Sequence, residues 1–315
     1  MTTTGIHIVP FSKAFEDKAL AMEKSAVQGR HVQLEIVKEQ FLSRAIVFDD
    51  YYACMALNEQ QEVIASSVAA KTIIRVNGRE TAAGIAFDTK VAEGWRKKGI
   101  GRQMAKHLFS VFFTPQKLQG VFMTAKRSNF SALNLAKWWA PGTSLYPFVY
   151  LAIPSHTKTR INEPVMQDRQ LFHVQLEDSN SLPANHYRHF VNGLGFFNTS
   201  RLYTLKIKKI SALYKVGIRL LKMIAPGKYA TLPAEGSTLS CAVLFNHTAS
   251  TISGIHEVLN KLQTDKIDQL LVCCQKNDVI YKAVRPLAIH CYDYWVLSDF
   301  ILRSHDAFTI DARCL

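Results

Sequence analysis

The sequence predicts an α/β protein of the α+β kind, in which helices flank a mixed central sheet and a second, similar domain follows. Apolar-alternating segments recur along the first half, and amphipathic helical segments separate several of them. A further strand–helix–strand group lies in residues 238–274. Because strands that alternate with helices build mixed sheets, we expect one domain at 1–155, a polar linker at 156–170 and a second domain at 171–315.

The composition is that of a folded protein with a basic surplus. Its 315 residues are 48% hydrophobic and 20% charged, with a net charge of +13. No apolar run approaches the roughly 20 residues of a membrane-spanning helix, and no secretion signal is visible at the start. The six cysteines lack C-x-x-C or metal-finger spacing. We therefore expect a cytoplasmic protein with reduced thiols, no metal and no transmembrane segment, and the basic surplus favours an anionic partner.

The elements expected before the centre of the first half follow from local patterns. Residues 51–57 and 63–76 predict long strands separated by a polar turn, and Asn77-Gly78 is a tight-hairpin signal that leads into the next strand. The other segments in this part are a strand at 6–9, a helix at 15–27 and a second helix at 32–42.

The strand that ends at Val91 and the helix after it define the centre of the first half. On period-two spacing the strand divides into two faces, which are Ile85, Phe87, Thr89 and Val91 against Ala86, Asp88 and Lys90. The helix carries apolar residues at helical spacing and stops at Thr114-Pro115. These residues are Ile100, Met104, Leu108, Val111 and Phe112.

Three elements are expected after that helix. They are a strand at 120–125, a helix at 130–139 and a strand at 144–153. Asn129 is a good N-cap for the helix, and Pro141-Gly142 ends it.

The loop between Val91 and Gly101 has the features of a phosphate site. A strand feeds a glycine-bearing cationic turn that opens a helix, where free N–H groups and the helix dipole attract anions. A Walker loop is excluded because Arg102 follows Gly101 where Lys should stand, and a Rossmann turn is excluded because its third glycine position is Met104. If a phosphate group binds this turn, the backbone amides from Lys97 to Arg102 would cradle it.

The pattern that does fit is Val-x-x-x-aromatic-Arg-x-x-Gly-x-Gly, which resembles the pyrophosphate loop of the GNAT acetyltransferase superfamily. The order of elements over residues 5–155 is also similar to the GNAT fold, and Asn129, Ala132 and Leu135 resemble the family's second motif. The resemblance implies acetyl-CoA as cofactor, pantetheine along the strand end, and a second half that has lost its phosphate loop. The implied cofactor residues are Val91, Ala92, Glu93, Arg96, Lys97, Lys98, Gly99, Ile100, Gly101, Arg102 and Asn129.

The resemblance implies an N-acetyltransferase in which a primary amine attacks the thioester directly. A base must first deprotonate the amine, and Asp88 and Glu93 are the acidic groups nearest the loop in sequence; both are equally compatible with exposed carboxylates that balance the cations. At the family's leaving-group tyrosine this sequence has Ala136. Tyr146 or Tyr150 from the next strand would substitute, unless they are core residues.

Residues 206–228 form a basic, apolar segment without acidic residues, which makes them a candidate contact with an anionic surface. A helix packed between the two halves is the alternative.

Two functions of the protein remain open. One is transfer to an amine acceptor, which is a small molecule or a protein. The other is a non-catalytic module that binds acyl-CoA, a membrane, RNA or a protein.

Overall fold

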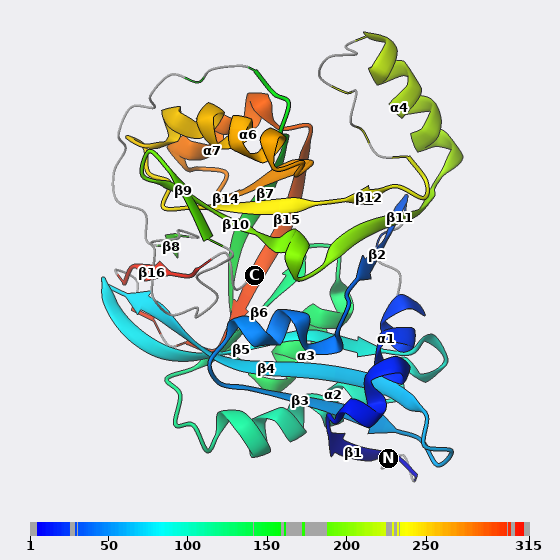
Figure 1. Ribbon diagram of the computed structural model, residues 1–315. Coiled ribbons are helices and arrows are strands. Elements are labelled where there is room, and N and C mark those ends of the chain that lie inside the picture. The colour runs from blue at the N-terminus through cyan, green and yellow to red at the C-terminus, as the bar shows by residue number, and fades with distance from the viewer. Residues whose placement is uncertain are drawn as a thin grey trace.

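One long mixed sheet, built by both halves of the chain, organises the molecule, and within the described residues it has thirteen strands (Figure 1). The computed structural model describes residues 5–25, 29, 31–140, 142–158, 161, 172–173, 188–224, 229, 232, 234–300, 302–303 and 306–311. The predicted mixed α/β architecture with flanking helices is confirmed.

The first half supplies six described strands of this sheet, five of them adjacent, and three helices. In chain order they are β1 (His7–Pro10), α1 (Glu16–Ser25), β3 (Tyr51–Leu57), β4 (Val63–Val76), β5 (Arg79–Val91), α2 (Ile100–Leu108), β6 (Val121–Lys126), α3 (Phe130–Trp139) and β7 (Ser144–Pro154). Each matches a predicted segment of the same type, with boundaries that differ by a few residues. The hairpin at Asn77-Gly78 is also confirmed, with φ of 53° and 77° at its two residues.

The predicted helix at 32–42 is wrong. Residues 32–37 form strand β2 (Val32–Val37), and a 3₁₀ segment follows at Phe41–Val47. β2 pairs antiparallel with β11 (Thr204–Ile210), and Glu35 of β2 is ion-paired with Lys208 at 2.9 Å. The strand forms because its partner, far along the chain, completes a small separate sheet of β12 (Thr238–Leu239), β11 and β2.

The second half extends the large sheet. Its strands are β8 (Phe172–His173), β9 (Arg188–Val191), β10 (Leu194–Asn198), β13 (Cys241–Phe245), β14 (Gln269–Cys274), β15 (His290–Ser298) and β16 (Phe308–Thr309). Its helices are α4 (Ala212–Ile224), α6 (Ile255–Thr264) and α7 (Val279–Val284). β13 and β14 run parallel, and α6 connects them, so the predicted strand–helix–strand group is present.

The two halves interlock through β15. The sheet order is β1-β3-β4-β5-β6-β15-β7-β14-β13-β10-β9, so β15 from the second half lies between two strands of the first. It pairs antiparallel with both, Tyr294 opposite Lys126 of β6 and also opposite Phe148 of β7. The division at residues 156–170 stays a prediction, while the sheet runs on across it.

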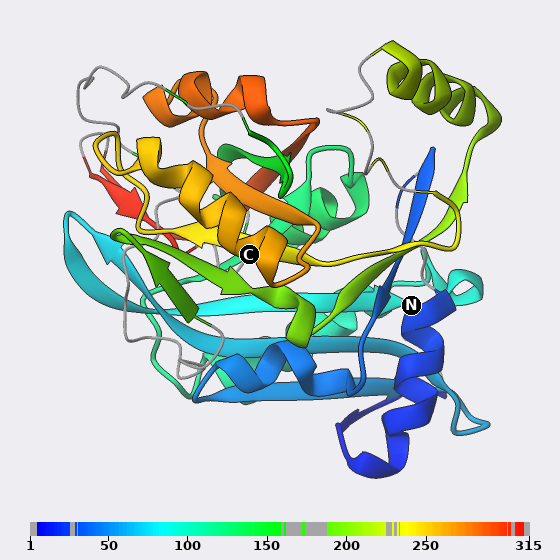
Figure 2. The same cartoon turned by 45° about the horizontal axis from the view of Figure 1, so that its top comes forward.

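Apolar clusters lie on both faces of the sheet. One face carries α2 and α3 against the first half and α6 and α7 against the second (Figures 1 and 2). The other face is enclosed between the halves by large side chains from distant elements, which include Ile74, Phe148, Phe197, Phe245 and Phe308. Helix α4 stands apart from this body in both views.

The helix that follows the loop ends in a π turn, which shifts the direction of the side chains after Leu108. Residues Phe109–Phe113 form a π turn, in which Thr114 N donates to Phe109 O at 2.9 Å. The extra residue turns Phe112 and Phe113 into the core and leaves Val111 46% exposed. The prediction that Val111 lies on the buried face is therefore wrong, whereas Ile100, Met104 and Leu108 are buried as expected.

Candidate functional site

A β-bulge interrupts the strand that leads to the loop. The pairing of β4 with β5 shifts between Ser66 and Val68, and Asp88 has a φ of 49°. As a result, Thr89 turns to the cavity described below together with Ala86, whereas Phe87 and Asp88 face the other side. The strict period-two division of this strand is therefore wrong beyond Phe87, although Asp88 does lie opposite Thr89.

Beside the bulge, β5 separates from its parallel neighbour β6. The two strands pair at Gly84 with Val121 and at Ile85 with Phe122, and they continue to Val91 and Lys126 without further pairing to each other. Because two parallel strands that part in mid-sheet leave backbone groups unpaired, this opening offers groups on β5 with which an extended chain can pair.

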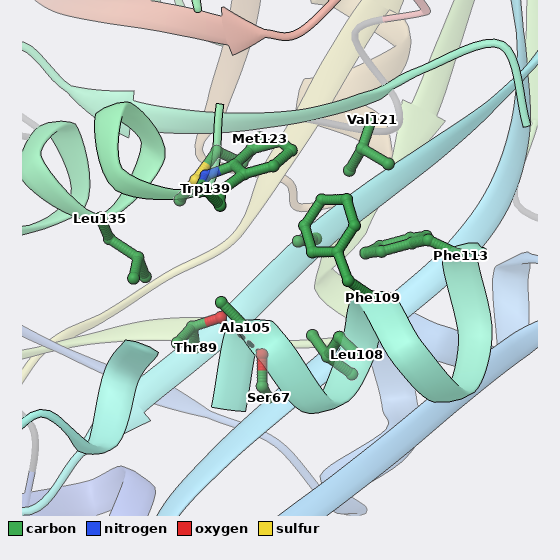
Figure 3. A pocket seen from close by; sticks show the side chains of 11 residues that line it. Ser67, Thr89, Ala105, Leu108, Phe109, Phe113, Val121, Met123, Leu135 and Trp139 are labelled. Carbon is green, nitrogen blue, oxygen red and sulfur yellow. Dashed lines mark hydrogen bonds between the residues drawn. The ribbon is translucent and has the colours of Figure 1, made fainter. Parts of the chain in front are cut away.

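A small cavity of about 20 Å³ lies at this opening, under α2 and α3 (Figure 3). Ser67 Oγ and Thr89 Oγ1, which are 2.6 Å apart, supply its hydroxyl groups. The ring centroids of Phe109 and Trp139, from the two helices, are 4.8 Å apart. The other lining residues are Ala86, Ala105, Leu108, Phe113, Val121, Met123 and Leu135. Among the described residues, no titratable side chain lines the cavity.

The predicted phosphate loop lies at the N-terminus of α2. A 3₁₀ turn at Glu93–Trp95 follows β5, Lys97 and Gly99 have φ of 62° and 81°, and α2 begins at Ile100. The left-handed backbone at Gly99 favours glycine. A Cβ on Gly101 would meet only Leu135 Cδ2, at 3.9 Å, so this glycine leaves open space beside the amides of Ile100 and Gly101. The N–H of Arg102, by contrast, donates to Gly99 O at 3.1 Å.

Cationic and aromatic side chains surround this turn. Lys98 Nζ lies 4.7 Å from the Trp95 ring centroid, and the Arg102 guanidinium lies 5.7 Å from that of Trp138 on α3. Arg96 folds back, and its Nε donates to Val91 O at 3.1 Å. The sign of this charge and the first-turn amides suit a group with several phosphates, such as coenzyme A.

Ala92 and Asn129, which are also implied cofactor residues, have partners within the protein. The N–H of Ala92 donates to Ile64 O at 2.9 Å. It is therefore engaged with β4 and is not free to stabilise the oxyanion that forms when an amine attacks a thioester. Asn129 caps α3, with its Oδ1 accepting from Ala132 N at 3.2 Å. Asn129 is exposed, so its side-chain NH₂ still faces solvent, and its role toward a cofactor stays a prediction.

Asp88 lies in a buried charge network. Its carboxylate accepts from Lys38 Nζ at 2.5 Å and from Arg44 Nη1 at 2.7 Å. Glu23 continues the network through Lys38 at 3.2 Å and Lys90 at 3.0 Å. Burial alone would raise the pKa of Asp88, but Arg44 and Lys38 hold that pKa well below its usual range. A carboxylate stabilised in this way is a weak proton acceptor, and its environment does not favour the predicted role of general base.

The other two predicted catalytic residues lie in different surroundings. Glu93 is exposed, directly after β5 and next to the loop. The Tyr146 ring packs against Phe308, with centroids 5.4 Å apart, in the cluster enclosed between the halves. Burial raises the pKa of Tyr146. The structure does not bring Glu93 and Tyr146 together, and their roles stay predictions.

A cluster that the sequence did not reveal lies on the enclosed face, behind β5. The Arg44 guanidinium lies 5.2 Å from the Phe87 ring centroid and 5.7 Å from that of Tyr203. The rings of Tyr150 and Tyr294 are 5.1 Å apart. Burial raises the pKa of all three tyrosines, so each keeps its proton at neutral pH. Their segments are far apart in the chain, and only Tyr150 was a sequence candidate.

These features define a class. A bulged strand, a splayed parallel neighbour, and a glycine-bearing turn at the start of the intervening helix are those of the GNAT fold. The chain has this fold, in the two-half arrangement of N-myristoyltransferase.

Two solved structures of Saccharomyces cerevisiae N-myristoyltransferase carry this comparison. One, with bound myristoyl-CoA and inhibitors, has a TM-score of 0.58 at 9% identity and covers 100% of this chain and 85% of its own. Another, with bound myristoyl-CoA, has a TM-score of 0.56 at 9% identity and covers 98% and 85%. At this identity the likeness establishes the fold alone.

A smaller match is Arabidopsis thaliana NAA60 in complex with a bisubstrate analogue, with a TM-score of 0.37 at 16% identity over 46% of this chain and 87% of its own. This score is too low to support an argument. No protein-family model matches the sequence, and no curated protein matches it either.

Proposed function

We propose that this protein is an acyl-CoA-dependent N-acyltransferase that uses acetyl-CoA and transfers its acyl group to an amine. The observation that carries the proposal is the alignment of three features at one strand end: the turn at Lys97–Gly101, the β5–β6 opening and the apolar cavity between α2 and α3. The cationic turn suits the pyrophosphate, and the opening suits the peptide-like pantetheine arm. The two yeast structures of the same fold contain myristoyl-CoA, which supports a cofactor of the CoA type.

The size of the cavity favours a short acyl group. About 20 Å³ holds little more than one water molecule, and the Phe109–Trp139 contact closes it on one side. A myristoyl chain would require these rings to move apart. We therefore place acetyl-CoA ahead of long-chain donors.

The residues have distinct tasks in this proposal. The amides of Ile100 and Gly101 bind phosphate, and Arg102 and Lys98 supply charge. Acetyl-CoA would supply a thioester, from which the acetyl group passes to the amine nitrogen as coenzyme A leaves as the thiolate. Glu93, the exposed acidic group nearest the strand end, takes the amine proton through water, since Asp88 is held by two cations.

The tyrosine cluster supplies the proton for the leaving thiolate. Tyr150, Tyr203 and Tyr294 keep their protons at neutral pH because burial raises the pKa of each. They pack on the enclosed face, toward which Phe87 of β5 also points. The acceptor is a small-molecule amine or an amino group of a protein.

A non-catalytic acyl-CoA-binding module is the second candidate. It is favoured by Ala136, which stands fully buried where the family's leaving-group tyrosine is expected, and by the absence of titratable side chains among the described cavity residues. Such a module would bind the cofactor with the same loop and release no free thiol.

Two measurements separate these functions. Calorimetry with coenzyme A, acetyl-CoA and myristoyl-CoA should show binding of the first two, which Gly99→Pro abolishes because proline cannot adopt φ of 81°. Far-UV circular dichroism of the variant controls for folding. Thiol release is then followed with polyamines, amino acids, aminoglycosides and peptides. Binding without release for any acceptor supports the module, and no binding of any CoA species overturns both candidates.

A further inference from the structure

Helix α4 carries an apolar face that no described part of the chain covers. None of its described residues is buried. On a helical projection, positions 213, 216, 220, 223 and 224 share one face. Their exposed fractions are 78% for Leu213, 53% for Val216, 53% for Leu220, 78% for Met223 and 80% for Ile224. Single exposed apolar residues are ordinary, but five on one face of a helix mark a contact surface.

A different side of α4 attaches it to the body. The rings of Tyr214 and His31 stack with centroids 4.8 Å apart. At the start of the helix, Lys215 pairs with Glu235 at 2.7 Å, and Glu235 also accepts from the N–H of Ile210. In Figures 1 and 2, α4 projects from the end of the small β12-β11-β2 sheet. The open apolar face is therefore held outward.

The charge beside this face has one sign. Arg219 lies at one edge of the apolar face and Lys222 on the opposite, polar side of the helix, and within the described part of the chain no acidic side chain pairs with either. Lys206 and Lys209 on β11 are exposed nearby in sequence. The segment 206–228 contains no acidic residue. An apolar face on a helix whose only charged residues are cations complements a surface that is apolar below and anionic above.

We propose that α4 docks this protein in the plane of an anionic lipid membrane. Its 13 residues span about 20 Å, enough to lay the five apolar side chains among the acyl chains while Arg219 and Lys222 contact the headgroups. A second copy of the chain is a poorer occupant, because face-to-face association would bring two cationic edges together in a protein of net charge +13. RNA is also poorer, because phosphates leave the apolar stripe in water.

Co-sedimentation with vesicles tests this. The full chain should bind vesicles of phosphatidylcholine with 30% phosphatidylserine (about a third anionic lipid) at least tenfold more tightly than pure phosphatidylcholine, and salt should weaken the binding. Met223→Ser with Ile224→Ser, and Arg219→Glu with Lys222→Glu, should each reduce binding at least tenfold. The matched controls should leave it unchanged. They are Ile46→Ser with Val111→Ser, which alter exposed apolar residues elsewhere, and Lys24→Glu with Lys282→Glu, which alter charge equally on other helices.

Three results would overturn the proposal. The first is equal binding of neutral and anionic vesicles, or no binding of either. The second is a dimer in light scattering that Met223→Ser with Ile224→Ser dissociates, which would assign the face to a second copy. The third is binding of RNA or of an acidic protein that the same variants abolish while vesicles are not bound. The readout is independent of acyl transfer, so it stands or falls apart from the proposed activity.

Discussion

Asp88 is the residue that connects the strand bulge to the core. Its carboxylate offsets two cations, Lys38 with no exposed side-chain surface and Arg44 with a fifth of its side chain exposed. Burial lowers the pKa of Arg44, but the nearby carboxylate of Asp88 raises it, and the pKa of Arg44 stays above its usual value. The carboxylate is therefore a structural anion that fixes Arg44 beside the tyrosine cluster.

We expect Asp88→Asn to lower the free energy of unfolding at pH 7 by about 3–5 kcal/mol, because it removes the carboxylate that contacts both buried cations, Lys38 and Arg44. The folded-state pKa of Asp88 is depressed, so its stabilisation is present above the unfolded value near ~3.9 and is lost as pH falls below it. Urea unfolding from pH 7 to pH 3 should show the difference between the proteins shrinking toward acid.

The control for this prediction is Asp265→Asn. Its partner Lys261 is four residues away on the surface of α6, so the change should cost about 0.3–0.5 kcal/mol. An Asp88→Asn protein of undiminished stability at pH 7 would contradict the structural role, and a shifted pH optimum for acyl transfer would restore Asp88 as a base.

A substitution at Gly101 can test cofactor binding without impairing folding. Because an added Cβ meets only Leu135 at 3.9 Å, Gly101→Ala should fold well and gain up to about 1 kcal/mol of stability from helix propensity. The same methyl group would occupy the space beside the first-turn amides. We expect the affinity for coenzyme A to fall at least tenfold in calorimetry.

Gly217→Ala is the matched control, since Gly217 also lies in a helix and its added Cβ meets nothing within 4 Å. It should be stabilised equally and should bind coenzyme A as the unchanged chain does. Equal affinity in both variants would mean that the cofactor does not approach Gly101.

At the scale of elements, α2 and α3 hold the two rings that close the cavity. Trp139→Ala removes the partner of Phe109 and enlarges the space between the helices. Each methylene that the enlarged cavity buries contributes about 0.8 kcal/mol, so the ratio of kcat/KM for hexanoyl-CoA to that for acetyl-CoA should rise at least tenfold.

Trp138→Ala tests whether this effect is local. Trp138 is the neighbouring residue on α3, it is 42% exposed, and it does not line the cavity. It should leave the acyl preference unchanged. If Trp139→Ala and Trp138→Ala have the same acyl preference, the acyl group does not lie in this cavity. The cavity would then hold only the pantetheine arm, or no part of the cofactor.

The elements that were predicted correctly have local signals. The turn from Val91 to Gly101, the hairpin at Asn77-Gly78 and the cap at Asn129 each depend on a few adjacent residues. β2 was mistaken for a helix because the strand that stabilises it, β11, lies in the other half of the chain. The bulge at Asp88 and the π turn at 109–113 shift the side-chain pattern by one residue, which period counting cannot anticipate.

The candidate site divides in the same way. Its phosphate loop is contiguous and was recognisable, whereas Arg44, Tyr203 and Tyr294 meet only after the halves close on each other. A cluster whose residues come from distant segments has no characteristic spacing by which the sequence could reveal it.

At the scale of the whole molecule, the first half depends on the second for a complete sheet. β15 fills the place between β6 and β7 with paired residues on both edges. It also supplies Val296 and Leu297, which are fully buried. We expect residues 1–155 alone to lack cooperative unfolding in circular dichroism and to bind no coenzyme A.

Co-expression of 1–155 with 156–315 should restore both properties, because the missing strand then returns in trans. A fragment 1–155 that unfolds cooperatively as a monomer would contradict this dependence and would establish the first half as an independent domain.

The place of β15 also bears on how the protein is made. At roughly 5–20 residues per second, a ribosome finishes β7 on the order of ten to thirty seconds before β15 emerges. Throughout that interval, the nascent chain presents two open strand edges that attract other chains. The sheet therefore cannot close until β15 has left the ribosome, so the slow stage of folding should come after the synthesis of β15 and should be chaperone-sensitive.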